Sequence, residues 1–165
     1  MNRLALTLAL GLVAGSTLIA TPDASHAQPT DSCNGQWLWQ ITFDGRDGIE
    51  EAIADFEEDG DLVVYSPPVV PALPGTGDDE ALYVSNSVGS WQEASEAGMT
   101  CTFSAVRLLA TDDGGSLGKV FLQGSVQVFA DGTGMEGTFT FDQSAGTGKT
   151  VNSGTGSVIG TSTGN

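Results

Sequence analysis

The sequence predicts an all-β fold, a single antiparallel up-and-down barrel of about eight strands. Aspartate–glycine pairs recur at 44–45, 47–48, 59–60, 113–114 and 131–132. Such pairs favour tight hairpin turns, because both residue types tolerate the positive φ that these turns need. The segments between the turns alternate apolar and polar residues with the period of a strand. A meander of hairpins closes most simply into a barrel, which leaves no free sheet edge.

A secretory signal peptide is predicted at residues 1–27. Arg3 gives a positive start, residues 4–20 form an apolar segment, and Ser25-His26-Ala27 fits a small–x–small cleavage site. The alternative is a membrane anchor, but the apolar segment is near the lower length limit for a span and contains Gly11 and Gly15. Cleavage after Ala27 predicts a secreted protein, extracellular or periplasmic, with no membrane insertion afterwards.

The remaining residues, 28–165, suit a single barrel domain. They include 4 basic and 20 acidic residues, which give a net charge of −16. This charge excludes nucleic acid as a partner and favours an exported protein that stays in solution. Loss of His26, the only histidine, removes imidazole catalysis and histidine metal ligation. We therefore expect no metal and no cofactor; nothing in the sequence indicates an oligomeric state.

Eight segments between the turns have the composition of strands. They span 36–43, 50–57, 61–66, 82–92, 99–110, 117–129, 134–142 and 150–161. The first is the clearest, because tryptophan, isoleucine and phenylalanine at odd positions alternate with mainly polar residues. The second also fits a short amphipathic helix, since Ile49, Ile53 and Phe56 have helical spacing. The acidic turn at 58–61 would join it to the third segment as a hairpin, and this favours the strand.

The later segments follow the same pattern. Segment 117–129 alternates valine and leucine with glutamine and serine, and 134–142 sets Phe139 and Phe141 against threonines. The last segment is rich in glycine and threonine. Between the third and fourth strands, residues 66–80 contain four prolines and form a long loop, because proline is excluded from central strands. Loops of this length often act as lids over binding sites.

Two cysteines, Cys33 and Cys101, lie outside the signal peptide. In an oxidising compartment such a pair is expected to form one disulfide. The bridge would tie the start of the domain to a central strand. Neither cysteine has a basic neighbour in sequence, so a reactive thiol has little support.

Three short motifs imitate catalytic or binding loops but lack a required part. Residues 114–118 match G-x-S-x-G without a histidine or a following helix, and 145–150 imitate a phosphate loop without a helix. Residues 55–60 begin like a calcium loop, but the twelfth position is Ser66. Weak calcium binding by acidic turns stays open. Carboxylates such as Glu93 and Glu136 would suit glycoside hydrolysis only at a fixed separation. We assign no catalytic residue.

The start of the first strand, Gly35-x-Trp37, resembles the opening motif of lipocalin-like, or calycin, barrels. The resemblance implies that Trp37 plugs a closed end and that a ligand enters at the opposite mouth. A second Gly89-Ser90-Trp91 and a last strand rich in glycine and threonine are similar to small secreted bacterial proteins of this plan. The chain departs from classical lipocalins because it has no C-terminal helix, and its only arginines after the signal are Arg46 and Arg107.

These observations favour a secreted, non-enzymatic barrel that binds or carries a small apolar ligand in its interior. The aromatic residues expected to line the pocket are Trp39, Phe43, Tyr65, Trp91 and Phe103, with residues 66–80 as a cover. One alternative is a barrel cyclase or isomerase that acts on a small apolar substrate through a buried glutamate or tyrosine. Another is an envelope or structural protein with a solid core.

Overall fold

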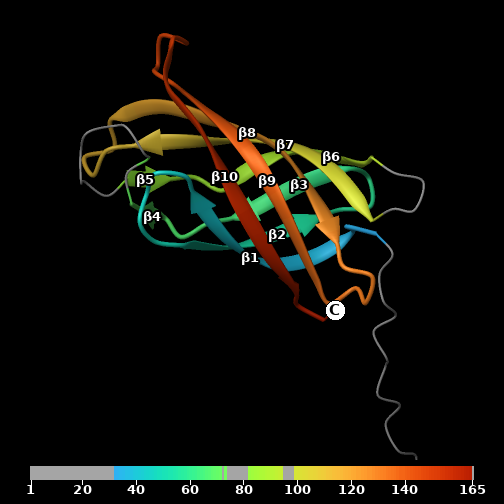
Figure 1. The fold of residues 1–165 in the computed structure, drawn as a ribbon. Coiled ribbons are helices and arrows are strands. Elements are labelled where there is room, and N and C mark those ends of the chain that lie inside the picture. The colour runs from blue at the N-terminus through green and yellow to red at the C-terminus, as the bar shows by residue number, and fades with distance from the viewer. Residues whose placement is uncertain (1–31, 72, 74–81, 95–98, 165) are drawn as a thin grey trace, which may run out of the picture.

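The computed structural model describes residues 32–71, 73, 82–94 and 99–164, so the predicted signal peptide lies outside the described residues. In this part of the chain every regular element is a strand (Figure 1). The ten strands are β1 (Gly35–Phe43), β2 (Glu50–Phe56), β3 (Asp61–Tyr65), β4 (Val69–Val70), β5 (Leu82–Val84), β6 (Ser87–Glu93), β7 (Thr100–Ala110), β8 (Ser116–Val128), β9 (Gly134–Ser144) and β10 (Thr150–Ser162).

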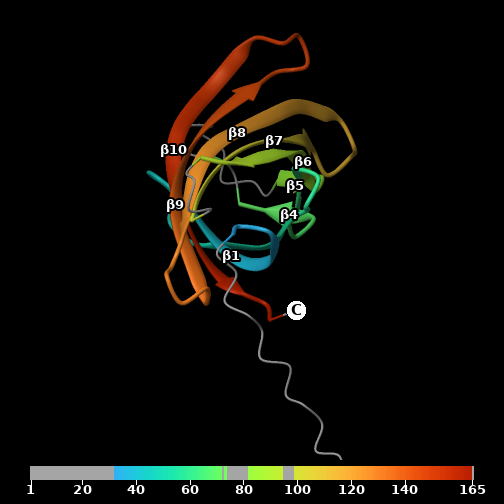
Figure 2. The same ribbon diagram turned by 90° about the vertical axis from the view of Figure 1, so that its right-hand side faces the viewer.

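Eight of the strands form a closed antiparallel up-and-down barrel, as predicted. They follow the order β7, β6, β3, β2, β1, β10, β9, β8, and the pairing of β8 with β7 closes the ring. The first and last strands meet along their length, from Trp37 opposite Ser162 to Phe43 opposite Gly156. Figure 2 shows the strands surrounding the interior. The other barrel pairings join barrel strands that follow one another along the chain, with β4 and β5 lying between β3 and β6, and this is the meander that the hairpin turns predict.

Strands β4 and β5 correct the predicted element boundaries. The single strand expected over 82–92 is divided into β5 and β6, which pair with different stretches of β7. At the break, the backbone N–H of Leu108 donates to the Ser85 hydroxyl at 3.0 Å instead of to a strand carbonyl. Strand β4 lies within the predicted loop 66–80 and pairs with β5 through two residues, Val69 and Val70. Together β4 and β5 extend the sheet at one end of the barrel.

Segment 50–57, which also fitted a helix, forms strand β2. Its burial alternates, with Glu50, Ala52, Ala54 and Phe56 buried and the intervening side chains more exposed. Ile53 lies on the outside with 42% of its surface exposed. The tertiary pairing with β1 and β3 therefore decides the conformation, and it places a glutamate on the inner face.

The predicted disulfide joins Cys33 to Cys101 at a Cα–Cα distance of 6.4 Å. Nearby, the Trp37 indole N–H donates to the Cys33 carbonyl at 2.8 Å, and the Trp37 side chain is almost fully buried. The bridge connects the residues before β1 to β7, across a sequence separation of 68. A loop of that length corresponds to about 4 kcal/mol of stabilisation in the chain-entropy model.

Glycines in the last strand make room for aromatic rings inside the barrel. A Cβ atom at Gly156 would lie 2.4 Å from the Phe139 ring and 2.5 Å from the Thr42 carbonyl oxygen. At Gly160 it would lie 2.6 Å from Met135 and 3.0 Å from the Trp39 ring. The glycine-rich composition of β10 thus allows large side chains from β1 and β9 to fill the interior.

Candidate functional site: the barrel interior

A small cavity of about 20 Å³ lies inside the barrel. Nine apolar side chains and three polar ones form its wall: Trp39, Ile41, Phe43, Val64, Phe103, Ala105, Leu122, Phe139 and Val158, with Ser66, Ser87 and Arg107. A cavity needs roughly 10–15 Å³ of this kind of space to hold one water molecule. The interior is therefore largely filled by side chains, with room for about one water-sized group beside the polar residues.

Three of the five predicted pocket residues meet at this cavity. Trp39 and Phe103 pack with their ring centroids 5.5 Å apart, and Phe43 packs edge-on against Phe139 at 5.3 Å. All three predicted residues are at most 6% exposed. They come from β1 and β7, which are not neighbours in the barrel, so they contact the cavity from different sides.

Trp91 belongs to a neighbouring part of the core. Its ring packs on Phe56 with centroids 5.5 Å apart, and its indole N–H donates to the Glu57 carbonyl at 2.8 Å. The side chain is partly exposed and does not contribute to the cavity wall.

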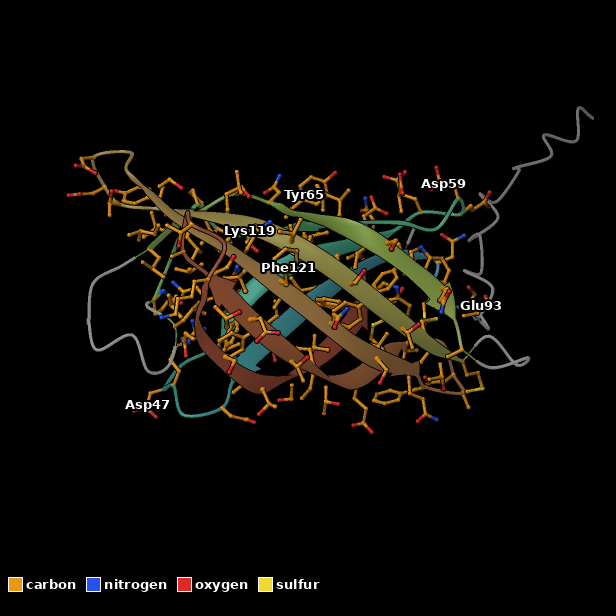
Figure 3. All side chains as sticks on the ribbon, turned by 90° about the horizontal axis from the view of Figure 1, so that it is seen from above. Asp47, Asp59, Tyr65, Glu93, Lys119 and Phe121 are labelled. Carbon is orange, nitrogen blue, oxygen red and sulfur yellow. A yellow bond between two sulfur atoms is a disulfide. The ribbon has the colours of Figure 1, made fainter. Side chains whose placement is uncertain are left out.

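Tyr65 lies on the outer face of the barrel, which corrects the expected pocket lining. Strand β3 buries Leu62 and Val64, so the alternation turns Tyr65 outward, with 46% of its surface exposed. Figure 3 shows Tyr65 with Lys119 and Phe121 on the outside of the strands. Because the strand carries four consecutive apolar residues, its sequence alone does not reveal which ones point inward.

An ion pair that the sequence did not predict crosses the interior. The Arg107 guanidinium donates from Nη1 to Glu50 Oε1 at 2.6 Å and from Nη2 to Oε2 at 3.5 Å. The two side chains are 2% and 1% exposed. They come from β7 and β2, which are separated by β3 and β6 in the barrel. Buried charges of this kind require pairing, because isolated charges in a protein interior are very costly.

Arg46 adds a second guanidinium to this ion pair. Its Nη2 lies 3.9 Å from Glu50 Oε2, and its Nη1 donates to the Pro71 carbonyl at 3.2 Å. Burial lowers the pKa of Arg46, the charge on Glu50 raises it in part, and the like charge on Arg107 lowers it further. Both arginines lie over the Phe43 ring, at 4.5 Å and 5.8 Å from its centroid. The charged groups are therefore at the Phe43 side of the cavity.

The described part of the proline-rich segment covers this end of the barrel. Val70 and Leu73 are each 2% exposed, and Leu73 packs into the same core as the cavity residues. The segment is held by the two-residue pairing of β4 with β5 and by the bond from Arg46 to Pro71. Residues 72 and 74–80 of the predicted loop lie outside the described residues.

Several buried polar atoms around the cavity have no hydrogen-bond partner in the described part of the chain. They are the hydroxyls of Ser66 and Ser87, Nε of Arg107, and Nε and Nη2 of Arg46. An unsatisfied buried donor or acceptor typically costs about 1–3 kcal/mol. A cluster of such atoms beside an apolar cavity is the pattern expected where a polar group of another molecule, or water, completes the hydrogen bonding.

No protein-family model, curated protein or solved structure matches this chain. Among the described residues there is no group of three potential metal-ligating side chains, and no helix is long and apolar enough to cross a membrane. The functional argument therefore rests on the interior site itself.

Two larger hollows lie on the outer surface. One, of about 410 Å³, is lined mainly by polar side chains of β6, β7 and β8, and the other, of about 480 Å³, crosses β8, β9 and β10. Both are more open than the interior cavity. Neither is lined by the buried arginine or the buried serine hydroxyls that distinguish the interior, which is why the interior is the candidate site.

The charged residues could have been found from the strand pattern. Arg107 has the same parity as Phe103 and Ala105 in segment 99–110, and Glu50 has the same parity as Ala52 in segment 50–57. A single glutamate and a single arginine on predicted inner faces form a complementary pair. Arg46 lies in the turn between β1 and β2, where no periodic signal identifies it.

Proposed function

We propose that this protein binds a small, mainly apolar molecule inside the barrel. The observation that carries the proposal is an apolar cavity in whose wall Nε of Arg107 and the hydroxyls of Ser66 and Ser87 lack hydrogen-bond partners among the described residues. The ligand would lie against Trp39, Phe43 and Phe103, beneath residues 66–71 and Leu73. In this arrangement apolar walls supply affinity, and a few polar groups fix orientation, as in small-molecule sites generally.

The volume of the cavity determines how a ligand enters. A space of about 20 Å³ is much smaller than a ligand of several carbon atoms. A larger ligand therefore has to displace side chains of the core around the cavity. The occupied site then consists of the cavity and the volume that these side chains leave.

Export and kinship with lipocalin-like barrels belong to the same proposal. The disulfide supports passage through an oxidising compartment, in agreement with the signal pattern at residues 1–27. The closed eight-strand barrel and the buried Trp37 near the start of β1 support the lipocalin-like resemblance. We propose that the mature protein is secreted and begins after Ala27.

The buried Glu50 is the observation that favours the alternative of a barrel cyclase or isomerase. A carboxylate in a mainly apolar interior can act as a general base. In the structure, however, both Glu50 oxygens lie near arginine nitrogens, and Glu50 does not form part of the cavity wall. This arrangement supports a charge-pairing role and makes binding the better-supported function.

A matched pair of alanine substitutions tests the binding proposal. Ala105 lines the cavity, whereas Ala52 is equally buried but lies outside the wall. We expect the neutral apolar fluorophore N-phenyl-1-naphthylamine to bind the wild-type protein. Because added methyl groups occupy the cavity, Ala105→Val should weaken binding at least tenfold, and Ala52→Val should weaken it less than threefold. No saturable binding to the wild type, or equal loss in both folded variants, would refute an interior site.

A further inference from the structure

The buried cluster of Arg46, Glu50 and Arg107 contains two positive charges and one negative charge. The three side chains are 8%, 1% and 2% exposed. Within the described residues, Glu50 is the only carboxylate within 4.0 Å of either guanidinium. Because a buried charge without a counter-charge is strongly unfavourable, the cluster lacks one negative charge as far as the described residues go.

The hydrogen bonds of the cluster are incomplete in the same place. Arg107 uses Nη1 and Nη2 on Glu50, which leaves its Nε without a partner among the described residues. Arg46 uses Nη1 on the Pro71 carbonyl, which leaves Nε and Nη2 without hydrogen bonds there. Ser87, 1% exposed, also has an unpartnered hydroxyl and shares the cavity wall with Arg107. The missing group must therefore accept hydrogen bonds and carry negative charge.

We propose that this cluster binds the carboxylate of the interior ligand, so that the ligand is an apolar acid. This inference rests on the proposed function and names the chemical class of the ligand. A carboxylate is planar and accepts several hydrogen bonds, which matches the fork of donors on a guanidinium. Its single negative charge brings the cluster to neutrality, whereas a phosphate monoester, with nearly two charges, would exceed it.

The positions of the two arginines connect the anion site with the apolar wall. Both guanidiniums lie over the ring of Phe43, and that ring lines the cavity together with Arg107. A carboxylate held here would direct its hydrocarbon part toward Trp39 and Phe103. The proline-rich segment joins the same site through the Pro71 carbonyl, which occupies one Arg46 donor.

Two ligands of equal chain length test the inference. Octanoate and 1-octanol have the same number of carbon atoms but differ in charge, and their affinities can be measured by isothermal titration calorimetry at pH 7 and low salt. We expect octanoate to bind at least tenfold more tightly than 1-octanol. The substitution Arg46→Gln should reduce this preference below threefold, because the second positive charge that the carboxylate would neutralise is then missing.

The control is Lys119→Gln, which removes one positive charge from the outer face, where Lys119 lies near Phe121. This variant should retain the preference for octanoate. If Arg46→Gln does not fold, Arg46→Lys preserves the charge but not the fork, and it should reduce the preference by at least threefold.

The outcomes separate the two proposals. If the wild type binds octanoate and 1-octanol equally, the carboxylate inference fails and the binding function stands. If Arg46→Gln and Lys119→Gln reduce the preference equally, or if acetate binds as tightly as octanoate, the inference also fails. If neither eight-carbon compound nor the neutral fluorophore binds, the proposed function itself is overturned.

Discussion

The substitution Glu50→Gln should destabilise the barrel far more than any surface charge change. It leaves Arg46 and Arg107 buried without their shared carboxylate, whose oxygen lies 2.6 Å from Arg107. Removing one partner of a buried ion pair costs about 3–5 kcal/mol. With an m-value of about 2 kcal/mol/M in urea, the unfolding midpoint should fall by roughly 2 M.

Glu51→Gln is the matched control for this prediction. Glu51 is the next residue in β2 and is exposed, so its substitution changes the net charge by the same amount. Its effect should lie within about 0.5 kcal/mol. The double variant Glu50→Gln with Arg107→Gln should cost less than the sum of the two single changes, because Glu50 and Arg107 are removed together and Arg46 alone is left without a carboxylate. Equal urea midpoints for Glu50→Gln and Glu51→Gln would refute the argument.

Three further predictions concern the barrel framework. Gly156→Ala places a Cβ 2.5 Å from the Thr42 carbonyl oxygen and should destabilise the protein by about 1–3 kcal/mol in thermal unfolding. The control Gly146→Ala, at a position with open space around it, should change stability by no more than about 0.5 kcal/mol. Equal melting temperatures of the two variants would contradict the packing of aromatic rings on the glycines of β10. Replacing both cysteines by alanine should lower stability by about 4 kcal/mol in urea, and a loss below about 1 kcal/mol would show that the bridge does not restrict the unfolded chain. Hydrogen bonds from the Thr111 hydroxyl and the Gly115 backbone N–H lower the pKa of Asp113 in the folded protein. The stability that the Asp113 carboxylate contributes is therefore present above its unfolded pKa of about 3.9 and is lost as the pH falls through the lower folded pKa. In a pH titration of the free energy of unfolding, Asp113→Asn should lose less stability at acid pH than the wild type, and an unchanged profile would contradict this.

The barrel and its disulfide were predictable because local signals agree with the tertiary structure. The turns at 44–48 and 59–60 separate segments whose alternation matches one buried face. Most pairings join consecutive segments, so only the closure of β10 on β1 and the pairing of β3 with β6, across β4 and β5, require contacts between distant parts of the chain. Closure follows from the cost of leaving a long sheet edge unpaired.

Tyr65 shows where the alternation signal fails. On the outer face, Val63 pairs with Val88, Val88 with Val106, and Val106 with Phe121, so one exterior row is apolar across four strands. A strand such as β3, which is apolar on both faces, does not reveal its orientation by composition. Only the register with β2 and β6 places Val64 inside and Tyr65 outside.

The charged part of the site was missed for a different reason. Charged side chains are rarely fully buried unless paired, so their residue types do not place Glu50 and Arg107 inside the barrel. Their pairing joins two residues that are 57 positions apart in the sequence and lie on strands that are not neighbours in the barrel. The candidate site is thus where the sequence departs from the simple rule of apolar inside and charged outside.

The tryptophan indole N–H signals in a ¹H–¹⁵N correlation spectrum test the interior site most directly. Trp39 lines the cavity, whereas Trp37 and Trp91 lie in other parts of the core, so the three indoles report on different places. Titration with octanoate should shift the Trp39 signal in a saturable way and leave the Trp37 signal nearly unchanged. A spectrum in which octanoate moves only backbone signals of outward-facing residues, with all three indoles unaffected, would contradict a ligand inside the barrel.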